Sequence, residues 1–502
     1  MPVDATGPSR PTPLTVVIMA AGEGTRMCSA KPKVLHEIAG RSLVEHVVRA
    51  CAPLDPDHLV VVAGHGRAAV ETHLGDVAKD TGRTIQVAVQ EPQRGTGHAV
   101  SCALSVLPPD LTGAVLVCNG DVPLLDTAVL AALLSGHDAG SAVTVLTAVV
   151  DDATGYGRIV RAADGSLDAI VEHRDATPEQ LAINEFNAGM YVFDAEVLAD
   201  ALARLTPHNA QSELYLTDVV GIARGDGHRV GALVCPDPWL VQGVNDRVQL
   251  AAVGAEYNRR LVEGWMRAGV TVVDPATTWL DAGVELARDA RIEPGVQLHG
   301  STRIGEGATI GPDTTLTDTV VGAGAQVIRT HGSQAEIGPG ASVGPFAYLR
   351  PGSVLGERGK IGTFVEVKNS QIGTGSKVPH LSYVGDATIG DYTNIGAASV
   401  FVNYDGVAKH RSVVGSHART GSDNMFVAPV SVGDGAYTGA GAVIRRNVPP
   451  GALAVSGGPQ RILDRWVLKH RQGTAAAEAA QRALDEQAGE NEQAGTDTDG
   501  KG

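Results

Sequence analysis

The chain has little cysteine, few aromatic residues, a deficit of positive charge and no long hydrophobic run. Its five cysteines form no CxxC pair, and an odd, scattered set of this kind is typical of reduced thiols in a cytosolic protein. Aromatic residues make up 4% of the 502 residues against 43% hydrophobic residues in total, so we expect a largely aliphatic core. The cysteines are Cys28, Cys51, Cys102, Cys118 and Cys235.

Acidic residues outnumber basic ones, 56 to 40, and the formal net charge is −16. This balance argues against nucleic acid as the main partner, because its phosphates are bound through Lys and Arg. The N-terminal segment Met1–Pro13 is polar and proline-rich without the apolar core of a signal peptide, and no stretch is long enough to span a membrane. We therefore predict a cytoplasmic protein that binds neither nucleic acid nor membrane.

A period of six residues is the strongest pattern that is present. Between Val414 and Ile444 every sixth residue is of a type that can point into a core, and a glycine follows most of these positions. The same period runs from Ile292 to Leu316 and from Ile337 to Val367. An α-helix has a period of 3.6 and a single strand a period of 2, so neither explains this spacing. It is typical of hexapeptide repeats and predicts a left-handed parallel β-helix.

Stacking is the physical basis of such a fold. Three hexapeptides make one triangular coil, and no coil buries its aliphatic residues without neighbours. With coils ~4.8 Å apart, about nine coils would give a prism roughly 40–45 Å long. An isolated prism would leave sheet edges uncovered, which favours self-association. The simplest alternative role for this region is a rigid spacer or a trimerisation rod.

The first ~250 residues alternate short aliphatic strands with helical stretches, which predicts an α/β domain with a Rossmann-like mixed sheet and ligands at the strand ends. We place this domain at residues 1–247, a helical linker at 248–268 and the β-helix domain at 269–502. From about residue 473 the chain is rich in Ala, Glu, Gln and Gly, which predicts a disordered acidic tail. The predicted strands are 14–20, 59–63, 85–90, 115–118 and 143–149.

A glycine-rich loop follows the first of these strands. It runs from Ala21 to Met27 and is followed by Lys31-Pro32-Lys33. Glycines let backbone N–H groups approach an anion closely, and a following helix adds its positive N-terminal end. A dinucleotide site would need a third glycine and a distant acid, whereas Arg26 and Lys33 here supply positive charge for a triphosphate. The loop therefore favours a nucleoside triphosphate over NAD.

The loop resembles the signature of sugar-nucleotide pyrophosphorylases, and further motifs narrow the match. Over roughly residues 14–470 the chain resembles the bacterial bifunctional N-acetylglucosamine-1-phosphate uridylyltransferase/glucosamine-1-phosphate N-acetyltransferase family. This resemblance implies acetyl transfer from acetyl-CoA to glucosamine 1-phosphate, then uridylyl transfer from UTP to N-acetylglucosamine 1-phosphate with release of pyrophosphate, for cell-envelope synthesis. The motifs are Gln90…Gly95-Thr96-Gly97-His98-Ala99, Asn119-Gly120-Asp121-Val122-Pro123-Leu124, Gly155-Tyr156-Gly157-Arg158-Ile159, Ile170-Val171-Glu172-His173, Asn187-Ala188-Gly189 and Gly243-Val244-Asn245.

The resemblance also implies roles in uridylyl transfer. Lys33 is implied to be a catalytic residue that steadies the phosphates, and Asp121 and Asn245 are implied to ligate Mg²⁺, which suits hard oxygen ligands. The sugar pocket is implied to be lined by Gly157, Glu172 and Asn187. The nucleotide is implied to be held by Met19, Ala20, Ala21, Gly22, Gln90, Gly95 and Thr96, with Arg26, Asn119 and Gly120 in the same site; the family often has Tyr where this chain has Asn119.

The β-helix contains a second candidate site. Arg350 and Lys368 lie eighteen residues apart, which is one full coil, so we expect them to stack on one face and to bind a phosphate monoester. The resemblance implies that His380 is the general base, and imidazole can take a proton from the sugar amine near neutral pH. It further implies sugar-phosphate contacts at Tyr383 and Asn394.

The remaining contacts are also implied by the resemblance. Glu366 would orient the sugar amine, and the segment around residues 379–406 interrupts the hexapeptide period, as expected at a site. Hexapeptide acyltransferases work as homotrimers with the cofactor between prisms, so a homotrimer is implied. The acetyl-CoA contacts are implied to be Ala397, Asn403, Tyr404, Ser422 and Ala440.

Two alternatives remain open at this point. The first is a single-activity sugar-1-phosphate nucleotidyltransferase whose β-helix serves assembly; it predicts no CoA-dependent thiol release and unchanged total activity in Lys368→Ala. The second is a non-catalytic regulatory subunit that kept both folds, which would lack the metal pair and the phosphate lysine. The presence of Lys33, Asp121 and Asn245 argues against the second.

Overall fold

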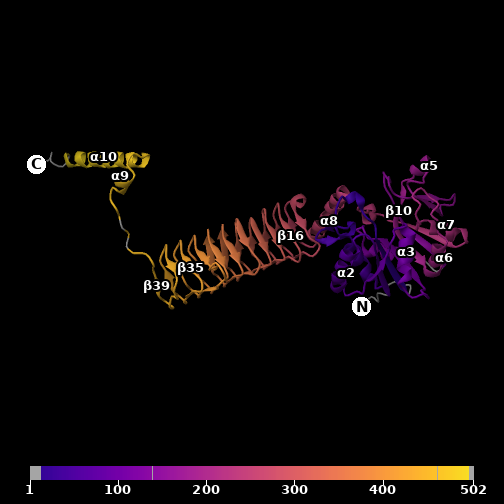
Figure 1. Cartoon of the computed structure of the whole chain (residues 1–502), viewed down its shortest axis with the longest axis horizontal. Helices are drawn as coiled ribbons and strands as arrows, with labels where there is room; N and C mark the ends of the chain where they lie inside the picture. Colours follow the sequence, from indigo (N-terminus) through magenta and orange to yellow (C-terminus); the bar gives the residue numbers. More distant parts are fainter. Residues whose placement is uncertain (1–12, 138–139, 459, 461, 497–502) are drawn as a thin grey trace.

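The computed structural model describes residues 13–137, 140–458, 460 and 462–496, so most of the polar N-terminal segment lies outside the described residues. A globular domain forms one end of the molecule, a long prism extends from it, and α9 (Trp466–His470) and α10 (Ala475–Thr496) lie beyond the far end of the prism (Figure 1). Within these residue ranges no helix has both the length and the apolar content needed to cross a membrane.

A mixed sheet forms the centre of the globular domain, as predicted. Valine-rich strands that are buried on both faces, such as β4 (His58–Ala63), suit a parallel core covered by helices. β1 (Leu14–Ala20) pairs in parallel with β4 and with β6 (Ala114–Asn119), whereas β10 (Glu185–Asp194) runs antiparallel to β6. The order is β11-β7-β10-β6-β1-β4-β5, with β7 (Ser141–Val149), β11 (Arg229–Val234), β5 (Gln86–Val89), β8 (Arg158–Arg161) and β9 (Leu167–Val171) as the other strands.

Helices cover both faces of this sheet (Figure 1). A short hairpin of β2 (Glu37–Ile38) and β3 (Arg41–Ser42) leads into α1. The helices are α1 (Leu43–Cys51), α2 (Arg67–Thr81), α3 (Thr96–Ser105), α4 (Thr127–Gly136), α5 (Pro178–Leu181), α6 (Ala195–Ala203), α7 (Asp218–Gly225) and α8 (Arg247–Arg267), with single 3₁₀ turns at Thr25–Met27, Lys33–Leu35, Ala52–Leu54, Pro238–Val241 and Pro275–Thr277.

The prism is a parallel β-helix whose three faces are three parallel sheets. The first contains β12 (Thr271–Val272), β15 (Arg291–Ile292), β18 (Thr309–Ile310), β21 (Gln326–Val327), β24 (Ser342–Val343), β27 (Lys360–Thr363) and β30 (Lys377–His380). The second contains β13 (Trp279–Leu280), β16 (Gln297–His299), β19 (Thr315–Thr317), β22 (Thr330–Ser333), β25 (Ala347–Leu349), β28 (Glu366–Lys368), β31 (Tyr383–Gly385), β33 (Val400–Val402), β35 (Met425–Val427) and β38 (Val443–Ile444). The third contains β14 (Glu285–Leu286), β17 (Arg303–Ile304), β20 (Val320–Val321), β23 (Ala335–Ile337), β26 (Ser353–Leu355), β29 (Gln371–Ile372), β32 (Ala387–Ile389), β34 (Ser412–Val414) and β36 (Ser431–Val432). β37 (Tyr437–Thr438) and β39 (Leu453–Ala454) pair near the end.

Every position of the six-residue pattern points into the prism. All the residues of the runs that begin at Ile292, Ile337 and Val414 are buried, and Phe401 and Phe426 stack in the core with ring centroids 4.8 Å apart. The prism begins at β12. One coil is longer than its neighbours, because Ala387 pairs with Ser412, whereas Ala335 pairs with Ser353. The extra residues form a loop between β33 and β34.

The two domains are joined by a helix and by a direct contact. Val262 of α8 packs into the aliphatic core of the prism. At the tip of the β2–β3 hairpin, the backbone carbonyl of Ala39 accepts a hydrogen bond from Ala282 N (2.9 Å). Gly40 has φ +75°, and a Cβ at this position would lie 2.6 Å from the carboxylate of Asp281. Only glycine therefore fits both the backbone conformation and the close approach of the prism.

The C-terminal segment differs from the prediction. The composition predicted disorder from about residue 473, whereas Ala475–Thr496 forms α10. Alanine, glutamate and glutamine are strong helix formers, so a polar segment of this composition can be helical without a buried face.

Candidate functional site

Three residues that are far apart in the sequence meet at one edge of the central sheet. The ammonium of Lys33 forms an ion pair with Asp121 and lies 3.4 Å from the amide oxygen of Asn245. Lys33 belongs to a 3₁₀ turn, Asp121 follows β6, and Asn245 precedes α8. The structure thus brings together the implied phosphate lysine and the two implied metal ligands.

A cavity of about 290 Å³ opens beside this cluster. Most of the residues predicted to hold the nucleotide line it, and Gln93, Val34, Ala99 and Glu213 complete its wall. Gln93 and Glu213 were not predicted from the sequence. A carboxamide two residues before the GTG motif was the one available signal for Gln93. The predicted residues on the wall are Met19, Ala20, Ala21, Gly22, Lys33, Gln90, Gly95, Thr96, Asn119 and Asp121.

Glycines allow the loops around the cavity to approach each other. Gly95 has φ +101°, and a Cβ there would lie 2.6 Å from the carbonyl oxygen of Leu214. The side chain of buried Gln90 donates a hydrogen bond to Gly95 O (2.8 Å), which fixes the start of α3 at the cavity. A Cβ at Gly24 would overlap the side chain of Lys33, so the glycine-rich loop packs directly on the phosphate lysine.

The implied sugar residues form an adjoining cluster. Asn187 N donates to Gly157 O (2.9 Å), and a Cβ at Gly157 would lie 3.4 Å from the carboxylate of Glu172. Burial raises the pKa of Glu172, the neighbouring carboxylates act in the same direction, and a hydrogen bond from Thr217 (3.3 Å) opposes them. Glu213, on the cavity wall, is one of these carboxylates, so the two clusters are neighbours.

Of the residues implied to hold the nucleotide, Arg26 and Gly120 do not lie on the cavity wall. Arg26 is exposed in the 3₁₀ turn Thr25–Met27 at the end of the glycine-rich loop. Gly120 lies behind the wall, where its N–H donates to Met19 O (2.9 Å). Gly120 therefore supports the neighbouring strand end, whereas Arg26 is exposed to solvent.

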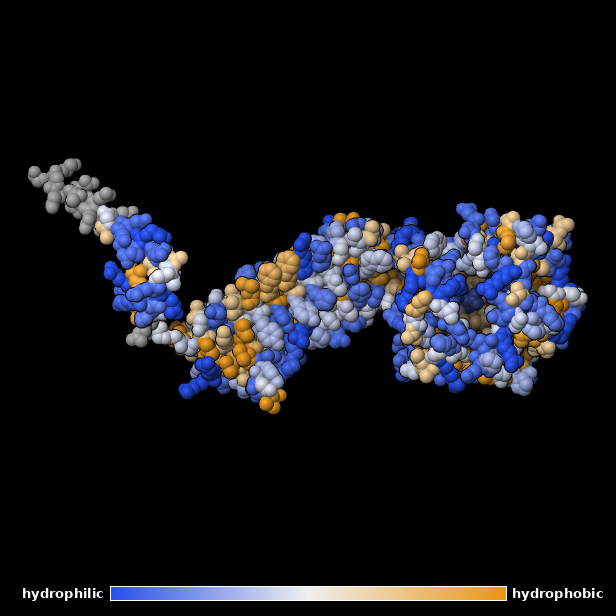
Figure 2. Space-filling view, turned by 45° about the horizontal axis from the view of Figure 1, so that its top comes forward, coloured by the Kyte–Doolittle hydropathy of each residue, from blue (hydrophilic) through white to orange (hydrophobic). Residues whose placement is uncertain are grey.

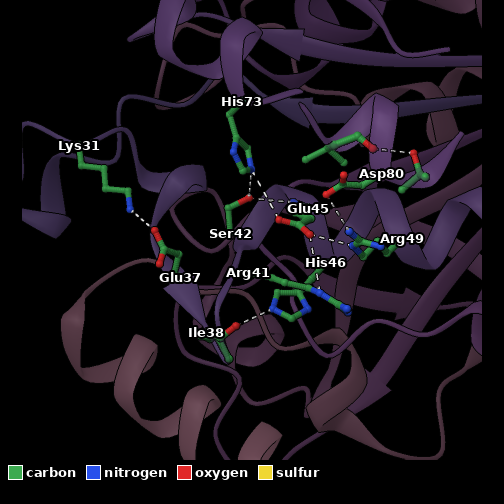
Figure 3. Close-up of polar contacts among 12 residues, drawn as sticks. Lys31, Glu37, Ile38, Arg41, Ser42, Glu45, His46, Arg49, His73 and Asp80 are labelled. Carbon is green, nitrogen blue, oxygen red and sulfur yellow. Dashed lines mark hydrogen bonds and ion pairs between the residues drawn. The ribbon is translucent and has the colours of Figure 1, made fainter. Parts of the chain in front are cut away.

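The segment after Lys33 is held by α1 (Figure 3). Ser42 caps this helix by accepting a hydrogen bond from Glu45 N (3.1 Å), and its hydroxyl also contacts His73 (2.8 Å). Glu45 accepts a hydrogen bond from Arg49 (2.8 Å). His46 Nε2 donates to the carbonyl of Ile38 (2.9 Å), since a carbonyl can only accept. These bonds fix the hairpin that connects Lys33 to the prism.

His46 makes the stability of this region depend on pH. Burial lowers its pKa from 6.5 to about 4. Above pH 6.5 the imidazole is neutral in both the folded and the unfolded state. Between pH 6.5 and 4 only the unfolded chain takes up the proton, so the stability of the folded state decreases as the pH is lowered. The full shift corresponds to about 3 kcal/mol. We expect wild type to lose about this much more unfolding free energy than His46→Gln between pH 7 and 4 in urea denaturation; parallel pH profiles would contradict the assignment.

The oxygen pair at Asp121 and Asn245 fits a magnesium ion. One carboxylate and one amide oxygen are hard donors, and the Lys33 ammonium between them shows that both are aimed at a point where positive charge is stabilised. Among the described residues no group of three or more His, Cys, Asp and Glu side chains could hold a metal. A magnesium ion here would complete its shell with water and substrate phosphates, as is usual for this ion.

The cations of the β-helix lie as predicted. Leu349 pairs with Val367, so Arg350 and Lys368 follow at adjacent positions of neighbouring coils. Arg350 donates to Glu366 (3.0 Å), and Lys368 donates to Asp386 (3.1 Å). The structure thus places Glu366 against Arg350.

Two further charged residues belong to this cluster and were not identified from the sequence. The ammonium of Lys368 lowers the pKa of Lys409, which therefore lies beside it on the extra loop. Burial alone would raise the pKa of Asp386, but hydrogen bonds from Lys368 and from two asparagines outweigh burial and lower it. One of them is Asn403, whose amide donates to Asp386 (2.5 Å). The sequence signal for Lys409 was its position at the end of the segment that interrupts the six-residue period.

The other implied residues lie on the same coils. His380 ends β30 at an exposed corner of the prism, and Tyr383 begins β31 immediately after that corner, opposite Glu366. Asn403 Nδ2 lies 3.4 Å from the hydroxyl of Tyr383. Asn394 lies on the first face, between Lys377 and Arg419 of the adjacent coils.

The implied acetyl-CoA residues follow a row of stacked glycines. Ala397, Ser422 and Ala440 come directly after Gly396, Gly421 and Gly439. A Cβ at Gly396 would lie 2.1 Å from the carbonyl oxygen of Gly421, and one at Gly421 would lie 2.5 Å from Ala440 N. The row is therefore one close-packed edge of the prism, while Tyr404 is exposed on the extra loop.

Comparison with known proteins covers both domains. Residues 16–214 match the model of the MobA-like NTP transferase domain. The Bifunctional protein GlmU of Nocardia farcinica is 62% identical over 477 residues, which are 94% of this chain and 96% of that protein. The proteins of the same name from Rhodococcus opacus (62% identical; 94% of this chain, 95% of that protein) and Corynebacterium efficiens (60% identical; 93% and 96%) match at similar length. The chain therefore belongs to the GlmU family of bifunctional proteins, the family that its motifs indicated.

Proposed function

We propose that this chain acetylates glucosamine 1-phosphate with acetyl-CoA and then couples the product to UTP, forming UDP-N-acetylglucosamine. The observation that carries the proposal is the presence of two separate cationic sites, one in each domain. Lys33 with Asp121 and Asn245 lies beside the 290 Å³ cavity, and Arg350 with Lys368 lies on the β-helix. Both substrates of each reaction carry phosphate, so each site must compensate negative charge.

Uridylyl transfer is chiefly a problem of charge and position. A phosphate oxygen of the sugar ester attacks the α-phosphorus of UTP, a new P–O bond forms, and the bond to the β-phosphate oxygen breaks to release pyrophosphate. The attacking group is already an anion, so no strong base is needed. Magnesium, when bound by Asp121 and Asn245, screens the phosphates. Lys33 supplies a fixed positive charge at the same point, and backbone N–H groups of the glycine-rich loop orient the triphosphate.

The adjoining cluster selects the sugar. Glu172 and Asn187 offer an acceptor and a donor for the hydroxyl and N-acetyl groups of N-acetylglucosamine 1-phosphate. Glu172 is half-buried and accepts a hydrogen bond from Thr217, and Asn187 donates to the hydroxyl of Tyr191 (2.6 Å), so both side chains are oriented before the sugar binds. Gly157 leaves the space that the sugar ring needs beside Glu172.

Acetyl transfer requires a neutral amine. His380 takes a proton from the sugar amine, whose nitrogen attacks the thioester carbonyl; the C–N bond forms, the C–S bond breaks, and CoA leaves as the thiol after taking up a proton. Arg350 and Lys368, with Lys409 beside them, hold the sugar phosphate. Asp386 keeps Lys368 charged and in place.

A homotrimer would complete the second site. Exposed Phe346 and Phe364 stack on neighbouring coils (5.3 Å), and exposed Leu381 follows them beside His380. Hydrophobic patches are visible on the surface of the prism (Figure 2). We place the protein in the cytoplasm, where UTP and acetyl-CoA are available and where free cysteines persist. Light scattering should return about three times the mass of one chain; a monomer mass would contradict this assembly.

The direct test uses the purified chain with glucosamine 1-phosphate, acetyl-CoA, UTP and Mg²⁺. We expect free thiol to appear first and pyrophosphate to follow. Omission of acetyl-CoA should stop both signals, and N-acetylglucosamine 1-phosphate should then restore pyrophosphate release alone. Pyrophosphate release from UTP without any thiol release under the complete conditions would support the single-activity alternative.

A further inference from the structure

The first turn of α8 contacts two parts of the uridylyl site, namely the backbone of Asn245 and the end of the glycine-rich loop. It begins immediately after Asn245, with Asp246 as the N-cap residue. The side chain of Asp246 accepts a hydrogen bond from Gln249 N (2.8 Å). Two other side chains of this turn make hydrogen bonds back toward the site: Arg247, although it is exposed, and half-buried Gln249.

Gln249 fixes the backbone of Asn245. Its side-chain oxygen accepts a hydrogen bond from Asn245 N (2.8 Å), and Val244 N donates to the carbonyl of Asp121 (2.9 Å). These two bonds hold the peptide groups on both sides of Val244. Because they fix the backbone of Asn245, they restrict where its amide oxygen points, which is toward Lys33 and Asp121.

Arg247 anchors the end of the glycine-rich loop. Its Nε donates to the backbone carbonyl of Met27 (3.2 Å). Met27 is buried and closes the loop through a hydrogen bond from its N–H to Gly24 O (2.9 Å), and Gly24 packs on the side chain of Lys33. A single guanidinium on α8 therefore links the triphosphate loop to the helix that begins at the implied metal ligand.

We propose that Gln249 and Arg247 are positioning residues for uridylyl transfer: Gln249 orients Asn245 toward the metal, and Arg247 holds the glycine-rich loop over the triphosphate. This inference rests on the proposed function of the same site. A single hydrogen bond contributes little to the stability of a domain, so its loss leaves the fold intact. The effect on the site is larger, because partners that orient metal ligands typically change metal affinity or activity by about 10–100-fold.

The test for Gln249 compares Gln249→Leu, which removes the acceptor at similar volume, with Gln249→Glu, which retains it. Val248→Ala is the matched control, since Val248 is 79% exposed in the same turn. Mn²⁺ binding in the presence of UTP, followed by electron paramagnetic resonance, reports the metal site without turnover. We expect about 10–100-fold weaker Mn²⁺ binding in Gln249→Leu and recovery of most of it in Gln249→Glu. Thiol release from glucosamine 1-phosphate and acetyl-CoA should stay at the wild-type rate.

The test for Arg247 uses the exposed trypsin site at Arg26 in the protein without ligands. Removal of the anchor should free the loop, so we expect severalfold faster cleavage after Arg26 in Arg247→Met. The KM for UTP should rise while kcat changes little. Arg259→Met is the matched control and should behave as wild type, because Arg259, another arginine of α8, donates to Glu256 and Glu263 of its own helix.

The outcomes are distinct. Unchanged Mn²⁺ binding in Gln249→Leu, or unchanged cleavage at Arg26 in Arg247→Met, would overturn the corresponding half of the proposal. A parallel fall of thiol release, pyrophosphate release and melting temperature would show a merely structural role and would also overturn it. If wild type itself neither binds Mn²⁺ with UTP nor releases pyrophosphate, the proposed function fails instead.

Discussion

Replacement of Asp121 by Asn should abolish pyrophosphate release while leaving thiol release unchanged. The substitution keeps the size of the side chain but removes the charge that balances Lys33 and would hold the metal. Loss of metal screening between two phosphates amounts to several kcal/mol of transition-state stabilisation, and about 4 kcal/mol corresponds to roughly 10³-fold in rate. The measurement is pyrophosphate release from UTP and N-acetylglucosamine 1-phosphate at saturating Mg²⁺.

The chain offers a matched control in the same loop. Asp126 caps α4 by accepting a hydrogen bond from Val129 N (2.8 Å), and Asn caps helices as well as Asp does. We therefore expect Asp126→Asn to keep both activities near the wild-type level. If Asp121→Asn retained most of its pyrophosphate release, the assignment of Asp121 as a metal ligand would be wrong.

Replacement of His380 by Ala should have the opposite selectivity. General-base catalysis typically contributes about 10²–10⁴-fold, so we expect thiol release to fall by that factor. Pyrophosphate release from supplied N-acetylglucosamine 1-phosphate should be unchanged, because His380 lies on the last strand of the first prism face, far from β6 in the fold. The measurement follows both products in the same preparation.

His331 provides the comparison for this variant. It is an exposed histidine on β22, an earlier coil of the same prism, and its ring packs against Tyr348 with ring centroids 5.6 Å apart. His331→Ala should retain thiol release. Equal losses in the two variants would assign the effect of His380→Ala to the fold and not to proton transfer, and loss of both activities in His380→Ala would refute the division of labour.

Periodic features of the sequence predicted the fold well, because each repeat carries its own information. The six-residue spacing reports burial position by position, and every residue of the three runs is buried. The short valine-rich segments predicted the mixed sheet, because they also mark buried positions. The helical segment after residue 473 was not predicted, since low hydrophobicity indicates only the absence of a core and does not exclude a solvated helix.

Site residues that belong to a sequence motif were predicted. Residues that reach a site only through tertiary contacts were not. Asp121 and Asn245 lie 88 and 212 residues after Lys33, and only family resemblance could associate the three before the structure was known. Glu213 reaches the nucleotide cavity because Gly97 N bonds to Leu214 O (2.8 Å), which is a tertiary contact without a local pattern. Lys409 was missed for a similar reason, since the length of the extra loop alone does not say where it folds.

The contact of Gly40 with Asp281 restricts how these two enzymes can be recombined. A chimera that grafts this prism onto another nucleotidyltransferase would place any side chain at the corresponding hairpin tip within overlap distance of the Asp281 carboxylate. Such a hybrid would need a glycine at the tip or a smaller residue on the first coil. The hairpin tip belongs to neither proposed site, yet its close contact with Asp281 limits which nucleotidyltransferase domains can be fused to this prism.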